Sequence, residues 1–226
     1  RSSDLAVNPG YNVLLLISGE ATAMTDEGMT LSSGKTYYTT DADKNIWDPD
    51  GTFVIEDSTV VVDPSNYTLD PLLGKVTLAD AYTVNGAVTV TGNYLPVFSI
   101  STARGYSGNF SRQMLDDTVF GDDAVSRKQG LFDATGTIER LDEGLVDYDT
   151  GGSSGQTIWD GLSNDTWKVI EIYEDADSDK VWRICTQFES NEIASAPDAL
   201  TTGALQWQGR LGTAITRSFS YGDPTA

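Results

Sequence analysis

The sequence contains no histidine, and its only cysteine is Cys185. Histidine is the commonest general base and the commonest transition-metal ligand, so most acid–base and metal chemistry would lack its usual residue. A single cysteine permits neither an internal disulfide nor a zinc–thiolate cluster. Cys185 lies in the strand-like stretch 181–188, so we expect a buried, inert thiol rather than a nucleophile.

The sequence also lacks a long apolar run. A membrane-spanning helix needs about 18 consecutive apolar residues, whereas the best run here covers only residues 13–17. That run is too short for the core of a signal peptide, and no basic region or cleavage site frames it. We therefore interpret it as a buried strand and expect no membrane contact. The chain begins at Arg1 rather than at methionine, which processing or a preceding leader would explain.

Basic residues are scarce, because 14 Lys and Arg stand against 34 Asp and Glu, a formal net charge of −20. Such a surface repels nucleic-acid phosphates and anionic membranes, so conventional DNA binding is not expected. An excess of acidic residues is also typical of proteins that are simply soluble or that come from salty habitats. The apolar and charged fractions, 39% and 21%, are close to globular averages and indicate a folded chain. Its 226 residues fit one large β domain or two small ones.

Strand-like segments dominate the first half of the chain. Each is rich in β-branched or aromatic residues and bounded by Gly, Asp, Asn or Pro. The segments cover residues 11–19, 35–40, 52–56, 59–62, 75–78 and 87–95. Many short strands with a turn roughly every ten residues predict an all-β sandwich or barrel.

The pattern of residues changes after Pro96. A long alternating stretch covers residues 97–110, a polar and acidic loop 111–130, and further strands 131–141, 167–173, 180–190 and 204–211. The only helix that we expect is short, near 157–163, with Thr157 as its cap. We therefore predict an amino-terminal β module over residues 1–96 and a second β domain over residues 97–226. Whether the halves are separate domains or one extended sheet stays open.

Two acidic turns, at residues 41–45 and 175–179, have the spacing of the first ligands of a calcium loop. The positions that need glycine and a bidentate glutamate hold Ile46, Thr52, Lys180 and Thr186. We interpret both turns as solvated and expect no metal and no cofactor. With 34 acids, chance carboxylate pairs are too common to indicate a glycosidase, and the tryptophans fit core packing. We predict no catalytic residue, so the chain is not expected to be an enzyme.

Three groups of segments together resemble the tail-tube (major tail) proteins of siphophages. The first comprises residues 17–25 (ISGEATAMT), Tyr37, 41–49 (DADKNIWDP), 67–77 (YTLDPLLGKVT) and 88–95 (VTVTGNYL), and is similar to the amino-terminal module of some of them. The second, 114–122 (MLDDTVFGD) with 130–131 and 134–137 (ATGT), resembles the acidic loop and next strand of the tube domain. The third is the order of the predicted elements, in which a helix is followed by a hairpin and then by residues 204–209 (ALQWQG).

The resemblance implies a virion structural protein. Such proteins form homo-hexameric rings that stack into the phage tail tube, together with other phage tail proteins, and conduct DNA into the host. Each subunit is a β-sandwich or split barrel with one flanking helix, made in the host cytoplasm. The net charge agrees with this, because an acidic bore would let phage DNA pass without specific binding, whereas Lys and Arg contacts would hold it.

The loop at 111–130 is too long for a simple hairpin turn and carries apolar residues in a polar stretch, so we expect it to make ring-stacking contacts. The predicted contact residues are Met114, Leu115, Asp116, Asp117, Val119 and Phe120. The alternative is that they fold back onto their own core.

Other classes of protein stay open at this point. A capsid decoration protein or another virion surface protein would also be acidic and β-rich without catalytic groups. A secreted carbohydrate-binding β module would need a row of exposed aromatics or an intact calcium site, and the sequence indicates neither. The shape of the purified particles distinguishes these classes, because a tail subunit is expected to form rings or tubes and the others discrete monomers or trimers.

Overall fold

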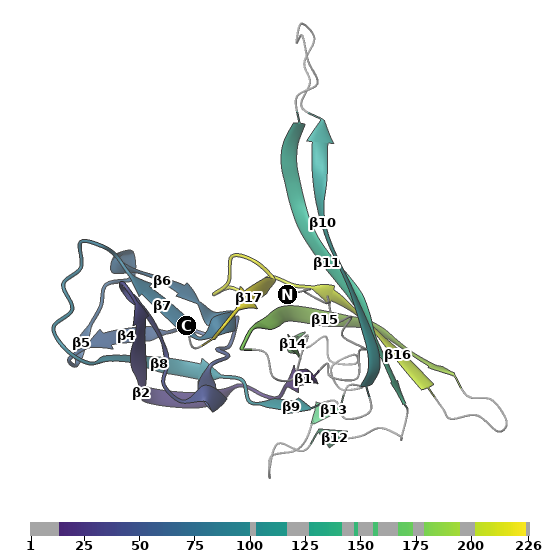
Figure 1. The fold of residues 1–226 in the computed structure, drawn as a ribbon, viewed down its shortest axis with the longest axis horizontal. Helices are drawn as coiled ribbons and strands as arrows, with labels where there is room; N and C mark the ends of the chain where they lie inside the picture. Colours follow the sequence, from purple (N-terminus) through teal and green to yellow (C-terminus); the bar gives the residue numbers. More distant parts are fainter. Residues whose placement is uncertain are drawn as a thin grey trace, which may run out of the picture.

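A computed structural model describes residues 14–99, 103–116, 127–141, 147–148, 156–157, 167–173, 179–194 and 202–224. These residues form two large antiparallel sheets and one small one (Figure 1). The predicted all-β class is therefore confirmed. The small sheet pairs β12 (Asp147–Tyr148) with β13 (Gln156–Thr157).

The larger sheet has eight strands. Their order is β10 (Ala103–Asp116), β11 (Arg127–Leu141), β16 (Thr202–Gly209), β15 (Val181–Ala194), β14 (Trp167–Tyr173), β1 (Leu14–Ser18) and β9 (Val97–Ser99), and β17 (Phe219–Gly222) pairs with β15. Side chains alternate between the two faces of a strand. One face of this sheet buries an apolar cluster that includes Leu15, Ile170, Ile184, Leu205 and Trp207.

The second sheet has seven strands. Together with the segments that connect them, it is here called the module. Their order is β5 (Val60–Val61), β4 (Val54–Asp57), β8 (Val88–Tyr94), β2 (Thr22–Ser33), β3 (Thr36–Thr39), β7 (Lys75–Leu78) and β6 (Tyr67–Asp70). Strand β2 pairs with β8 through its first half and with β3 through its second, and its register shifts between Met24 and Glu27. Asp26 has a φ of 50° in this bulge, which bends the strand. The sheet thus surrounds one core around Trp47.

The module is inserted between two neighbouring strands of the larger sheet. Strands β1 and β9 pair antiparallel, with Ser18 opposite Val97, and Gly19 N donates to Pro96 O at 2.7 Å. The chain leaves β1, builds the whole module, and returns beside its starting point. Residues 14–18 therefore belong to the larger sheet, although they precede the predicted boundary at residue 96. The division into two domains remains a prediction.

Several elements differ from the sequence-based expectations. The prediction of an acidic loop over residues 111–130 is wrong, because β10 continues to Asp116 and β11 begins at Arg127. A two-stranded ribbon takes its place and projects beyond the rest of the fold (Figure 1). Thr157, the expected helix cap, ends β13, and residues 158–163 lie outside the described residues. Three short 3₁₀ helices were not predicted: η1 (Ala42–Lys44), η2 (Pro64–Asn66) and η3 (Pro71–Leu73).

A buried guanidinium joins the module to the larger sheet. Arg183 and Glu171 face each other across β15 and β14, and their side chains are 1% and 3% exposed. Arg183 Nε and Nη2 donate to Glu171 Oε1 at 3.0 and 2.8 Å. Its Nη1 donates to the carbonyl oxygens of Asn45 and Leu72 at 2.8 and 2.9 Å, and its Nη2 to Asn45 Oδ1 at 2.6 Å. One side chain thus binds β14 and two turns of the module.

Apolar packing and further hydrogen bonds reinforce this junction. Ile46, Leu72 and Leu95 of the module pack with Val169, Cys185 and Ile215 of the other part. Asp70 accepts hydrogen bonds from Ser220 Oγ at 2.9 Å and from Arg217 Nη2 at 3.2 Å. Thr213 N donates to Asp50 Oδ1 at 2.8 Å. The contacts hold the module at several separate points.

We predict that Arg183→Met lowers the free energy of unfolding by about 3–5 kcal/mol, because it leaves the buried Glu171 carboxylate without its partner. Arg217→Met is the control, since Arg217 pairs with Asp70 at the surface and such pairs contribute about 1 kcal/mol or less. Urea unfolding followed by tryptophan fluorescence measures both. Equal shifts in the two midpoints would show that Arg183 has no special role.

Candidate functional site

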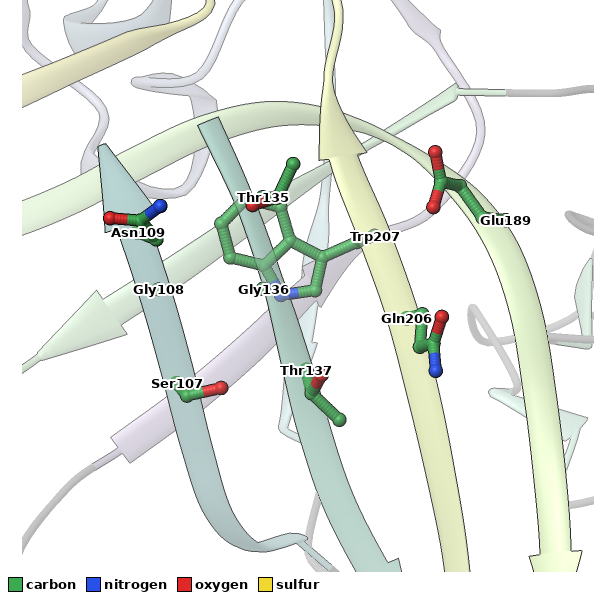
Figure 2. Close-up of a pocket in the computed structure, with 9 residues that line it drawn as sticks. All are labelled: Ser107, Gly108, Asn109, Thr135, Gly136, Thr137, Glu189, Gln206 and Trp207. Atoms are coloured by element: carbon green, nitrogen blue, oxygen red, sulfur yellow. The ribbon is translucent and has the colours of Figure 1, made fainter. Parts of the chain in front are cut away.

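A polar groove lies on the other face of the larger sheet, away from the apolar cluster. Its volume is about 420 Å³, and it crosses β10, β11, β16 and β15 (Figure 2). The lining side chains and backbone come from Ser107, Gly108, Asn109, Thr135, Gly136, Thr137, Glu189, Gln206 and Trp207. The strand register explains the arrangement, since Ser107 pairs with Thr137 and Thr137 with Gln206. Residues opposite one another in neighbouring strands share a face.

The floor of the groove is backbone supported by an indole. Gly108 and Gly136 face each other across β10 and β11, and Trp207, which is 2% exposed, packs behind them. A Cβ on Gly136 would overlap both the Trp207 ring and the Ser107 carbonyl oxygen. Glycine at 136 therefore allows the strands and the ring to pack closely, which keeps this part of the groove flat.

The groove carries hydrogen-bonding groups and negative charge. Three hydroxyls and two side-chain amides line it, and Glu189 is the only charged residue among the nine. Asp133 and Glu139 are exposed on β11 at positions that alternate in phase with Thr135 and Thr137. None of the lining residues is basic. The nine lining residues can therefore form hydrogen bonds with water or a polar surface, but they present no cation to bind phosphate.

Strand β10 forms one edge of the larger sheet. It runs for 14 residues and, within the described part of the chain, pairs only with β11. The predicted contact residues Met114, Leu115 and Asp116 lie on this strand, opposite Gln129, Lys128 and Arg127. Asp117, Val119 and Phe120 lie outside the described residues. The structure therefore brings half of the predicted set onto the projecting ribbon.

An aromatic cluster occupies the opposite face, near the base of the ribbon. Phe110 stacks on Trp182 with ring centroids 5.3 Å apart, and Tyr221 lies 4.4 Å from the same indole. Phe110 also packs on Phe219 at 5.2 Å. Phe110 and Tyr221 remain 38% and 44% exposed. This cluster was not predicted from the sequence, because β17, which supplies two of the rings, was not predicted.

The described residues show no group of three or more acids or cysteines that could hold a metal. In the turn at 41–45, Asp41 accepts a hydrogen bond from Asp43 N, and Lys44 forms ion pairs with Asp41 and Glu27. Of the second acidic turn, only Asp179 is described. Cys185 is buried as expected, and burial raises the pKa of its thiol to about 12. Within the described part, no helix is long and apolar enough to cross a membrane.

No family model and no curated protein sequence matches this chain. Among solved structures, the chain is similar to a protein from the tail of an empty gene transfer agent particle with C6 symmetry. The TM-score is 0.41 and the identity 11%, over 56% of this chain and 87% of that one. A protein from the virion of a native gene transfer agent particle gives a TM-score of 0.41 and 12% identity, over 56% and 88% of the two chains.

We predict that Gly136→Ala destabilises the protein by about 1–3 kcal/mol or more, because the added methyl overpacks the space held by Trp207. Gly108→Ala is the matched control on the paired strand, where a Cβ would meet Trp207 at an ordinary 3.6 Å. Urea unfolding of the two variants measures the difference. A Gly108→Ala variant that is as unstable as Gly136→Ala would contradict this account of the groove floor.

Proposed function

We propose that this chain is a structural subunit of a phage-type virion, and that it forms the homo-hexameric, stacked rings of a tail tube through which DNA passes. The observation that carries the proposal is the edge strand β10, which pairs only with β11 among the described residues and lies on a ribbon that projects beyond the sheet (Figure 1). The proposed role is mechanical and not catalytic. The proposal also draws on the resemblance to tail-tube proteins of the segments at 17–25, 41–49, 67–77, 88–95, 114–122, 130–131, 134–137 and 204–209 together with Tyr37.

The open edge supports assembly. A 14-residue edge strand presents a row of backbone N–H and C=O groups that can pair with another chain. Globular proteins usually shorten, cover or interrupt such edges. Here the edge is long, and its ribbon projects beyond the rest of the fold, where a neighbouring subunit could pair with it. In this proposal Met114, Leu115 and Asp116, with Asp117, Val119 and Phe120, make the contacts between stacked rings.

The polar groove supports the conduit. If β10 pairs with the next subunit, the grooved faces of neighbouring subunits continue one another around a ring. A bore lined by hydroxyls, amides and Glu189 would stay hydrated and would repel phosphates. DNA held by many lysine or arginine contacts would bind tightly and in a salt-dependent manner. The proposed lining offers none, so DNA would pass without specific binding.

We predict that the purified protein forms rings or tubes, and that shortening the ribbon abolishes the tubes. In the shortened variant, Asn-Gly replaces residues 113–131. The new two-residue turn joins Arg112 to Phe132, which already face each other, and Asn-Gly suits such a turn. Negative-stain electron microscopy and analytical ultracentrifugation measure assembly.

Leu31→Ser is the control for that experiment, because Leu31 is exposed on the module and distant from the ribbon in sequence. Its tubes should be normal. Tubes from a correctly folded shortened variant would refute the role of the ribbon. Wild-type protein that stays as discrete monomers or trimers would instead favour a capsid decoration or other virion surface protein.

We further predict that a lysine in the groove makes assembled tubes bind DNA, whereas a lysine on the module has a smaller effect. Gln206→Lys places the charge on the proposed bore, and Val61→Lys places it on an exposed strand of the module. Short fluorescent duplexes titrated against the tubes measure binding. Each phosphate contact should steepen the slope of log K against log salt by about 0.9. Wild-type tubes should not bind, and equal binding by the two variants would contradict the proposed bore.

A further inference from the structure

The loop between β7 and β8 contains the sequence pair Asn85–Gly86, the one Asn–Gly pair in the chain. Both residues are exposed to solvent. In such a pair the backbone nitrogen of glycine can attack the side-chain amide carbon of asparagine. The new N–C bond closes a succinimide ring, the C–N bond to the amide breaks, and ammonia leaves with the displaced proton. Water then opens the ring to aspartate or isoaspartate.

Glycine favours this reaction because it has no Cβ to obstruct the ring and its backbone is permissive. Two things must happen first. The Gly86 nitrogen must lose its proton, and it must approach the Asn85 amide carbon. A structure that holds both groups in other hydrogen bonds therefore slows the reaction.

The carboxylate of Asp57 makes those hydrogen bonds. Gly86 N donates to Asp57 Oδ1 at 2.8 Å, and Asn85 N donates to Asp57 Oδ2 at 2.7 Å. The Asn85 side-chain amide donates to Asp57 Oδ2 at 3.2 Å and to Thr83 O at 3.3 Å. The attacking nitrogen and the amide under attack are thus both bound to one carboxylate, which is 1% exposed.

The negative charge of Asp57 also disfavours succinimide formation. Burial raises the pKa of this carboxyl, but hydrogen bonds from Asn85, Gly86 and Tyr82 outweigh burial and keep the pKa below its usual value. The group is therefore an anion at neutral pH. Loss of the Gly86 proton would create a second negative charge beside it, which is unfavourable. A carboxylate of low pKa is also a weak base for removing that proton.

Further contacts surround the loop on both sides. A Cβ on residue 86 would overlap Ser58 Oγ, in the tight turn where Ser58 and Thr59 both have positive φ. A side chain at residue 86 would therefore require the Ser58 hydroxyl to rotate away. On the other side of the loop, Lys35 Nζ donates to the carbonyl oxygens of Ala79, Asp80 and Tyr82. Two charged side chains from the module hold the loop that contains Asn85–Gly86.

We propose that Asn85 is a latent deamidation site, and that Asp57 protects it by binding the Gly86 amide and the Asn85 side chain. Asp57→Asn keeps the shape of the side chain but removes the charge and one acceptor oxygen. A charge-assisted hydrogen bond lost from the closed loop should raise the deamidation rate about tenfold or more. Deamidation to aspartate would also place a second carboxylate against Asp57 and remove the amide donor.

The experiment incubates the folded full chain at pH 8 and follows the Asn85 peptide by mass spectrometry, with isoaspartate detected in the digest. Wild-type protein, Asp57→Asn and Tyr82→Phe are compared. Tyr82→Phe is the matched control, because it removes one hydrogen bond to Asp57 but leaves those of Asn85 and Gly86. We expect slow deamidation in wild type and Tyr82→Phe, and fast deamidation in Asp57→Asn.

A synthetic peptide of residues 80–90 gives the unprotected rate and keeps the test independent of how well Asp57→Asn folds. Wild-type protein that deamidates as fast as this peptide would overturn the proposal. Slower deamidation in folded Asp57→Asn than in wild type would show that the carboxylate assists the reaction instead. If Asp57→Asn does not fold, hydrogen exchange of the Gly86 amide in wild type decides. Exchange much slower than in the peptide supports protection, and equal exchange refutes it.

Discussion

The buried guanidinium of Arg183 is the constraint on which the arrangement of the two sheets depends. An ionised side chain is costly to bury unless its donors are satisfied, and Arg183 has acceptors in both sheets: Glu171 beside it, and Asn45 and Leu72 in the module. Neither sheet alone satisfies the group. The pairing therefore specifies one docking position for the module, and the apolar cluster of Ile46, Leu72, Leu95, Val169, Cys185 and Ile215 supplies the burial that makes docking favourable.

This junction determines which faces of the larger sheet are available. The module covers the face of β14 and β15 that carries Arg183 and Cys185, and the same face continues onto β16, β11 and β10. There the lining consists of hydroxyls, amides and one acid, Glu189. One sheet face is thus partly interior and partly solvated. The module is inserted in the β1–β9 hairpin, so its position is limited by both ends of the insertion as well as by Arg183.

Buried or half-buried charges recur where the chain needs a fixed loop rather than a large core. Asp57 and Lys35 hold the segment between β7 and β8, and Asp70 binds Ser220 of β17. The carboxylates of Asp57 and Asp70 each accept several hydrogen bonds, which offset the cost of desolvating a buried acid. An acidic composition thus contributes to specific structure as well as to surface charge.

The sequence alone determined the all-β class, the strands at 75–78 and 167–173, and the buried thiol of Cys185, because alternation and turn residues act over a few neighbouring positions. It gave no indication of β2, whose polar residues bend around a bulge, or of the ribbon in place of the loop at 111–130. Only the tertiary structure brought Arg183 to Asn45 and Leu72, joined β1 to β9 across the whole module, and placed Ser107, Thr137 and Gln206 on one face. These contacts link residues far apart in the chain, so they depend on strand register and sheet packing, which local sequence patterns do not encode.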